Sequence, residues 1–287
     1  MPNPLTMKLE QFTSFDPAER LRLDELLSYP TKTWSRGSTI IHEGSKVDNI
    51  HLVLRGLAAR SKTLRSGDRQ FMALLVPGDL CDVEVFVLAG MDHDIVAMSD
   101  TSCVLIPAKI IEGLLTESTN LTKALWWSTM TDSAVLREWI VDHGSRSSIE
   151  RVAHLICEML IRYRIIGEAT DNSFPFPLTQ DELADATGMT TVYINRMLQK
   201  LRAEGLIELT GNVLTVLDPQ GLQQVAEYDS TYLHLSRTER RDPKVAGRAK
   251  DLVSPTRGGM LHDAAEKVKS VFTGSDDDAS QTGPRER

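Results

Sequence analysis

The chain has 287 residues, of which 41% are hydrophobic and 25% are charged. This is a globular composition, and the length predicts two domains because a single hydrophobic core stops growing at about 250–300 residues. The sequence contains neither an apolar run of the roughly 20 residues that span a bilayer nor a secretory signal, so we expect a cytoplasmic protein with no membrane partner.

The first predicted elements are a short helix and a series of short strands. Residues 16–28 begin with Asp16, a good N-cap, and Pro17, which suits the first helical position. From 33 to 107, short apolar runs alternate with glycine turns every 7 to 12 residues. This texture predicts an antiparallel sandwich or barrel, with a hairpin tip at 65–68 and a tight turn at 77–79.

Glycine is nearly absent from 108–142, where the pattern becomes helical. We predict a short helix at 109–115, a long one at 118–142 that residues 143–145 end, and another from about 148 to 166. Apolar spacings of three and four in the long helix favour pairing with a second copy in a dimer. The predicted dimer residues are Leu121, Leu125, Leu136 and Trp139. The alternative is a helix packed only on its own domain.

Residues 179–203 read TQDELADATGMTTVYINRMLQKLRA and carry the clearest functional pattern. Counted from Gln180, a small residue (Ala184) is fifth, a glycine (Gly188) is ninth and an apolar residue (Ile194) is fifteenth. A helix-turn-helix needs these types at these places, because the fifth residue faces the second helix, the ninth lies in a tight turn and the fifteenth packs inward. Three constraints met together predict such a motif.

The outward face of the second helix is basic, with three cations and no acid between 190 and 203, although the whole chain has a net charge of −8. Attraction for DNA should be focused on this helix, since residues 145–225 contain seven cations and ten acids. Arginine can read guanine, asparagine can read adenine, and hydroxyls and lysine can hold phosphates. The predicted DNA contacts are Thr179, Thr190, Thr191, Val192, Tyr193, Asn195, Arg196, Gln199 and Lys200. The alternative is a solvated amphipathic helix.

Two short strands, 206–209 and 213–217, are predicted to follow around a Thr-Gly-Asn turn and form a wing. The motif would then be a winged helix-turn-helix. The chain loses periodicity after about Glu227, and we predict a disordered tail over 222–287, within which 261–272 has the pattern of a short amphipathic helix.

These segments resemble the Crp/Fnr family of bacterial transcription regulators. The resemblance rests on RGSTIIHEGSKVDNIHLVLRGLA and LVPGDL in the first half, and on LTQDELADATGM and INRMLQKLRAEGLI in the second. It implies an α+β chain: an antiparallel β-roll of the cyclic-nucleotide-binding type (jelly-roll-like), a long dimerisation helix, a winged helix-turn-helix and a disordered tail. The expected bounds are 1–116, 117–143, 144–221 and 222–287. The implied protein is a homodimer that binds inverted repeats in double-stranded DNA and contacts RNA polymerase, and is not an enzyme.

The sequence departs from the cyclic-nucleotide sensors of this family. Asp82-Val83 stand where a Gly-Glu pair would hold the ribose, and His93-Asp94 where an Arg-Ser or Arg-Thr pair would hold the phosphate. A carboxylate repels a phosphate, so we expect no tight binding of cyclic AMP, although a shifted pocket at these four residues is left open. Val192 likewise replaces a glutamate that many relatives use to read cytosine.

Other cofactors and functions are weighed against this interpretation. No cysteine precedes Cys81, which excludes the N-terminal iron–sulfur cluster of Fnr-type sensors. Cys81, Cys103 and His93 are candidate haem ligands, and Cys81 or Cys157 candidate redox thiols, but buried structural roles are commoner. We therefore expect no cofactor or metal and an unidentified effector. The alternative function is a ligand-binding sensory or scaffold protein that uses its winged helix for protein contacts.

Overall fold

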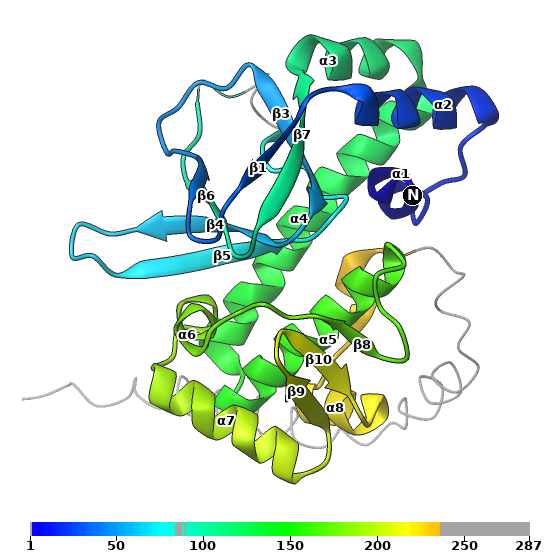
Figure 1. The fold of residues 1–287 in the computed structure, drawn as a ribbon. Helices are drawn as coiled ribbons and strands as arrows, with labels where there is room; N and C mark the ends of the chain where they lie inside the picture. Colours follow the sequence, from blue (N-terminus) through cyan, green and yellow to red (C-terminus); the bar gives the residue numbers. More distant parts are fainter. Residues whose placement is uncertain (1, 84–87, 89, 236–287) are drawn as a thin grey trace, which may run out of the picture. The chain divides into compact units, whose positions relative to one another are not determined.

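A helix of 27 residues, α4 (Thr119–Ser145), connects the two halves of the described chain (Figure 1). The computed structural model describes residues 2–83, 88 and 90–235. The strands β1 to β7 lie toward one end of α4, and helices α5 to α8 lie toward its other end. The predicted order of β-roll, long helix and helix-turn-helix is confirmed. The segment 261–272 lies outside the described residues.

Strands β1 to β7 form two antiparallel sheets, in the orders β1-β7-β3 and β2-β6-β4-β5. Their bounds are β1 Thr31–Trp34, β2 Thr39–Ile41, β3 Asn49–Arg55, β4 Ala58–Thr63, β5 Arg69–Leu75, β6 Asp94–Ala97 and β7 Thr101–Pro107. The hairpin tip predicted at 65–68 joins β4 to β5. The turn predicted at 77–79 also forms, with Gly78 at φ +90°.

Short helices precede and follow these strands along the chain. Their bounds are α1 Pro4–Leu9, α2 Pro17–Glu25, the 3-10 turn η1 Leu26–Ser28, and α3 Ala108–Glu117. A capping box between Asp16 and Glu19 starts α2, as the aspartate-proline pair predicts. Helix α1 was not predicted; its backbone passes so close to Gly78 that a Cβ there would lie 2.6 Å from the carbonyl oxygen of Pro4. Only glycine fits this contact.

The second half differs from the prediction at two boundaries. Helix α4 continues through 143–145 because Arg146, just beyond its end, pairs with Glu138 and Asp142 and places a cation at the C-terminal dipole. The chain is also ordered through 222–235, where a disordered tail was expected. The bounds are α5 Ser148–Ile165, β8 Ser173–Pro175, α6 Gln180–Thr187, α7 Thr191–Ala203, β9 Ile207–Thr210, β10 Val213–Val216, α8 Pro219–Ala226 and the 3-10 turn η3 Ser230–Leu233.

Residues 222–235 are ordered because they complete the core of the second half. Leu222 and Ala226 of α8 are fully buried, and Leu233 of η3 is nearly so. Tyr232 packs its ring on His154 of α5, with 5.7 Å between centroids, and its hydroxyl lies 3.1 Å from a carboxylate oxygen of Glu158. The segment thus seals the region where α4 meets α5.

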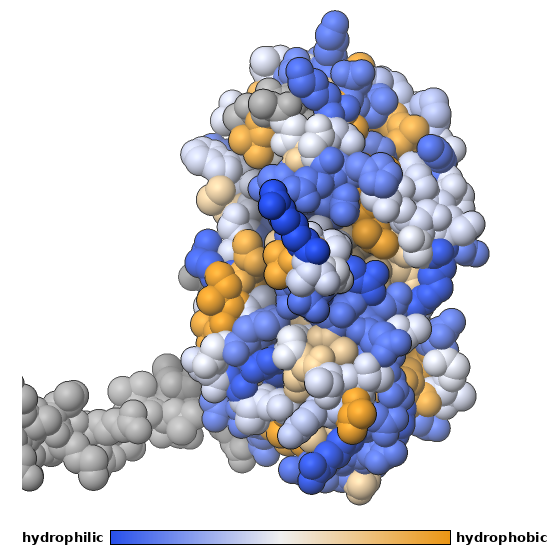
Figure 2. Space-filling view, turned by 90° about the vertical axis from the view of Figure 1, so that its left-hand side faces the viewer, coloured by the Kyte–Doolittle hydropathy of each residue, from blue (hydrophilic) through white to orange (hydrophobic). Residues whose placement is uncertain are grey.

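Three of the four predicted dimer residues do not lie on the surface of the subunit, where a second copy could contact them. Leu121, Leu125 and Trp139 are buried within their own subunit, at 1%, 4% and 4% exposure, and only Leu136 is exposed. The helix nevertheless leaves a set of large apolar side chains uncovered. These are Trp126, Met130, Leu136, Ile140 and Val141. The face drawn in Figure 2 has a group of hydrophobic side chains at one edge.

A groove of about 470 Å³ lies between α4 and β5. Leu136 and Ile140 line one side of it, and Phe71 and Met72 line the other.

Among the helices of the described ranges, none is long and apolar enough to cross a membrane. The described part of the chain also contains no group of three or more histidine, cysteine or acidic side chains placed to hold a metal ion.

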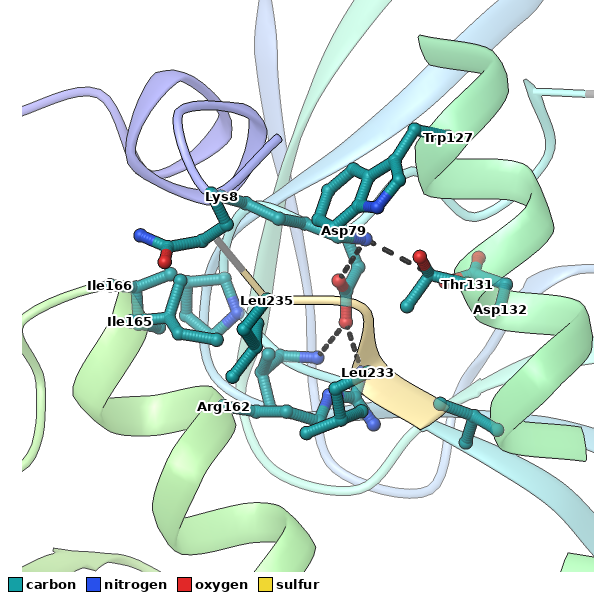
Figure 3. A pocket seen from close by; sticks show the side chains of 14 residues that line it. Lys8, Asp79, Trp127, Thr131, Asp132, Arg162, Ile165, Ile166, Leu233 and Leu235 are labelled. Carbon is teal, nitrogen blue, oxygen red and sulfur yellow. Dashed lines mark hydrogen bonds and ion pairs between the residues drawn. The ribbon is translucent and has the colours of Figure 1, made fainter. Parts of the chain in front are cut away.

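A buried cluster of charges joins the two halves beside α4 (Figure 3). Asp79, in the turn after β5, lies between Lys8 of α1 and Arg162 of α5, with oxygen-to-nitrogen distances of 2.8 and 2.6 Å. Arg162 also binds Glu158, which has no exposed surface, at 3.1 Å. The adjoining cavity of about 40 Å³ has room for water but not for a nucleotide.

Candidate nucleic-acid interface

Helices α6 and α7 form the helix-turn-helix that the spacing predicts. Thr179 caps α6 and shares a capping box with Glu182. Gly188 ends α6 in the left-handed conformation, at φ +64°, which glycine adopts without the penalty of a Cβ. The side chain of Thr190 then caps α7 by accepting a bond from the backbone N–H of Tyr193 at 3.4 Å.

The inward face of α7 is fixed by apolar packing. Ile194, Leu198 and Leu201 are 0–1% exposed and belong to the same hydrophobic core as Leu183 and Ala184 of α6. Burial of three such side chains stabilises this orientation by several kcal/mol, at about 1.5–3 kcal/mol each. The opposite face of α7 is therefore held toward solvent.

Two hydrogen bonds between side chains join the start of α7 to the start of α6. The Thr191 hydroxyl donates to Asp181 at 2.6 Å, and the Asn195 amide donates to the side-chain oxygen of Gln180 at 3.0 Å. Asn195 keeps its carbonyl oxygen and one N–H free of this bond. Gln180 thereby orients Asn195, a role that the sequence pattern did not predict, since only the fold brings the two side chains together.

The predicted contact residues differ in how exposed their side chains are and in whether they are already hydrogen-bonded within the protein. Val192 and Tyr193 are 78% and 52% exposed, and Arg196, Gln199 and Lys200 are also exposed. The hydroxyls of Thr179 and Thr190 serve as helix caps at this surface, while Thr191 and Asn195 are half-buried by their bonds to α6. Lys200 lies 4.0 Å from Glu204, too far for a strong ion pair on the surface. The arrangement can present hydrogen-bond donors and cations to a groove.

The predicted wing is present and is larger than expected. Strands β9 and β10 pair around a turn in which Gly211 has φ +58°. Strand β8, which the sequence pattern did not predict, adds to β10 and completes a three-stranded sheet in the order β8-β10-β9. Residues 211 and 212 form the tip of the wing, between the paired residues Thr210 and Val213.

Two family models match the chain. The model of the Crp-like helix-turn-helix domain matches residues 150–225, and that of the cyclic nucleotide-binding domain matches residues 31–118. The chain belongs to the Crp/Fnr family of DNA-binding transcription regulators. It is not an enzyme, because the members of this family are transcription regulators.

Several Crp/Fnr relatives are similar over most of their length. The transcriptional activator FnrL of Cereibacter sphaeroides is 27% identical over 199 residues, which are 68% of this chain and 79% of FnrL. The nitrogen fixation regulation protein FixK of Bradyrhizobium diazoefficiens is 24% identical over 193 residues, 67% of this chain and 80% of FixK. The solved structure of FixK2 from Bradyrhizobium japonicum has the same fold, with a TM-score of 0.62 and 21% identity over 70% of this chain and 98% of FixK2.

The residues predicted for an effector pocket in this Crp/Fnr chain bind separate partners. Asp82 is fully buried and turned toward His51, whose backbone N–H and Nδ1 each lie 2.7 Å from a carboxylate oxygen. Asp94 accepts a bond from the backbone of Glu43, and His93 pairs with Asp92. Val83 packs beside the apolar core around Leu80. Neither the 470 Å³ groove nor the 40 Å³ cavity is lined by these four residues.

The cysteines of this chain have environments typical of structural thiols. Cys81, Cys103 and Cys157 are all buried. A hydrogen bond with Cys103 and burial raise the pKa of Cys81, and burial raises the pKa of Cys157 to about 12. A raised pKa leaves little thiolate at neutral pH, so neither thiol is primed for oxidation.

Replacing Gly188 with alanine is expected to lower the free energy of unfolding by about 1–2 kcal/mol, because a side chain at φ +64° is strained. The added Cβ would also lie 3.0 Å from the ring of His143 at the end of α4. Gly211→Ala is the matched control, since it carries similar strain with no atom within 4 Å of the Cβ. Thermal or denaturant melts should show the larger loss at Gly188; equal losses would mean that the contact with His143 yields at no cost.

Proposed function

We propose that this protein is a homodimeric regulator that reads an inverted repeat in double-stranded DNA with α7, and that its effector is not a cyclic nucleotide. The observation that carries the proposal is the outward face of α7, which is acid-free from 190 to 203 and is held in place by two caps, a buried inner face and two bonds to α6. We place the protein in the cytoplasm, where bacterial DNA lies.

Several side chains on the outward side of α7 suit particular DNA groups. Arg196 can donate two bonds to O6 and N7 of guanine, and Asn195, oriented by Gln180, can bond adenine. Val192 is exposed enough to contact a thymine methyl group. The hydroxyls at the helix caps and Lys200 suit phosphate oxygens. The half-site should differ from that of relatives with a glutamate at the position of Val192.

The exposed apolar side of α4 supports the dimer. A stripe of large apolar side chains from Trp126 to Val141 stays in contact with water in one subunit, and the groove between α4 and β5 continues it. A two-fold axis along α4 would bury the same stripe on both subunits. The two copies of α7 would then enter successive major grooves, about 34–36 Å apart. RNA polymerase is the further partner that the family resemblance implies.

The absence of a nucleotide effector is supported by the β-roll. Asp82 is directed into the core toward His51, and Asp94 accepts a bond from the backbone of Glu43. Both are carboxylates, so they cannot supply the cation that a cyclic phosphate requires. Isothermal titration of the purified protein with cyclic AMP is expected to show no binding. A saturable heat at micromolar cyclic AMP would contradict this part of the proposal.

Selection from random duplex DNA tests the main proposal. The purified, effector-free protein should enrich an inverted repeat, and Arg196→Ala should lose the enrichment. Arg202→Ala, an exposed cation near the end of the same helix, is the matched control and should keep the preferred sequence. If folded wild-type protein enriches no sequence, either in buffer or with cell extract added, the proposal is wrong; loss of sequence preference in the control would instead refute the assignment of reading to Arg196.

A further inference from the structure

Two arginines of the β-roll hold α6, the first helix of the helix-turn-helix. Arg36, in the turn between β1 and β2, pairs with Glu182 and donates to the carbonyl oxygen of Pro177 at 2.7 Å. Arg69, at the start of β5, binds Asp185 through two nitrogens, Nε at 2.8 Å and Nη2 at 2.6 Å. Arg36 comes from a turn and Arg69 from a strand of the β-roll, and their acidic partners Glu182 and Asp185 lie three residues apart on one helix.

Each arginine makes more interactions than the single contact of an ordinary surface ion pair. Two nitrogens of Arg69 meet one oxygen, Oδ2, of Asp185, and its guanidinium lies 4.7 Å above the ring of Phe71, which is itself buried. Arg36 also donates to the carbonyl oxygen of Met98, so one guanidinium joins the β-roll to the segment before α6. Each guanidinium is thus fixed by more than one partner, and ion pairs held in such networks are the exposed pairs that contribute measurably.

The charge of α6 explains why such contacts matter for DNA. This helix carries Asp181, Glu182 and Asp185 beside a helix that must approach phosphates. Residues 145–225 contain seven cations and ten acids, so the domain does not balance its own charge. Asp181 accepts a bond from Thr191, while the other two acids are paired with the β-roll arginines. The counter-charges for α6 thus come from outside the DNA-binding domain.

We infer that Arg36 and Arg69 are positioning residues for DNA reading. They hold α6 against the β-roll and neutralise two of its carboxylates. The position of α6 is passed to α7 by the bonds Asp181–Thr191 and Gln180–Asn195. The first half of the chain therefore fixes the position of the reading helix α7 through α6, in addition to any effect that passes along α4. This inference rests on the proposed DNA-binding function.

A charge swap at the Arg69–Asp185 pair tests the inference. Arg69→Glu is expected to weaken binding to the selected DNA site by about tenfold, within the usual range of coupling between contacting residues, with little change in the melting temperature. Adding Asp185→Arg should restore most of the affinity, because the ion pair is rebuilt in reverse. A role in stability alone would change the melting temperature and leave the preference for the selected site over random DNA unchanged.

Arg65→Glu provides the matched control. Arg65 is exposed at the tip of the same hairpin, so the variant changes the net charge by the same amount without touching α6. It should bind the selected site as the wild type does. If Arg65→Glu and Arg69→Glu lose affinity equally, or if the swap fails to rescue, the inference is overturned while DNA binding stands. If the wild type itself binds no selected site, the proposed function fails instead.

Discussion

Replacing Arg162 with methionine is expected to lower the free energy of unfolding by about 3–5 kcal/mol, the usual loss when one partner of a buried ion pair is removed. Methionine keeps much of the length of the side chain but removes the cation that binds both Asp79 and Glu158. Glu158 would keep only its bonds from Trp139 and Tyr232. Denaturant melts followed by circular dichroism measure the loss.

Arg164→Met is the control for this prediction. Arg164 lies two residues further along the same helix, is exposed and bonds the side chain of Asn172. Its loss should change stability by less than about 0.5 kcal/mol, as is usual for surface positions. A similar, small loss at Arg162 would mean that the buried cluster does not hold the two halves together.

The same cluster predicts the direction of the pH dependence. Burial raises the pKa of Asp79, but the charges of Lys8 and Arg162 lower it by more, so the net shift is downward. A depressed carboxyl pKa adds stability above the unfolded value of about 3.9 and loses it as the pH falls through the folded value. Wild-type stability should therefore fall more steeply below about pH 4 than that of Asp79→Asn. Parallel curves from pH 7 to pH 2 would contradict the assignment.

Replacing Ile140 with glutamate is expected to convert the dimer to a monomer and to weaken binding to an inverted repeat by about 100-fold, because the avidity of two linked reading helices is lost. Ile140 is 64% exposed in one subunit and lies within the apolar stripe of α4. A charge at this position would have to be buried on both sides of a two-fold interface. Sedimentation velocity and titration of labelled DNA measure the two effects.

Leu21→Glu is the matched control for the dimer. Leu21 is a similarly exposed apolar residue, at 59%, but lies on α2, away from the stripe. The variant should remain dimeric and bind DNA with the affinity of the wild type. A dimeric Ile140→Glu protein would place the subunit interface elsewhere on the molecule.

Local signals explain why the helix-turn-helix was predictable. Thr179 and Thr190 cap their helices, and Gly188 forms the left-handed turn, through interactions that span only a few residues. The inward positions of α7 follow from the helical period alone. For the same reason the wing turn at Gly211 and the hairpin tip at 65–68 were correctly placed. Strand β8 carries no such signal, because it is short and depends on its pairing with β10. Helix α1 does carry one, the N-cap Asn3 before Pro4, and the prediction missed it.

Apolar spacing shows that a side chain will be buried but not which surface buries it. Leu121, Leu125 and Trp139 have the spacing of a dimer seam, yet their own subunit covers them, while Ile140 and Trp126 remain exposed. The tail illustrates the same limit. Its composition is polar, but Tyr232 and Leu233 pack against the apolar core where α4 meets α5.

The amino-acid sequence by itself determined the order of the domains, the capped helices of the reading motif and the basic outward face of α7. Each of these depends on residues close together in the chain, where propensity and periodicity act directly. Only the tertiary structure decided the partners of the charged groups: Asp79 with Lys8 and Arg162, Asp82 with His51, and Asp185 with Arg69. These pairs join residues 31 to 116 positions apart, so their formation depends on how distant elements pack, within the first half or between the two halves, rather than on any local pattern.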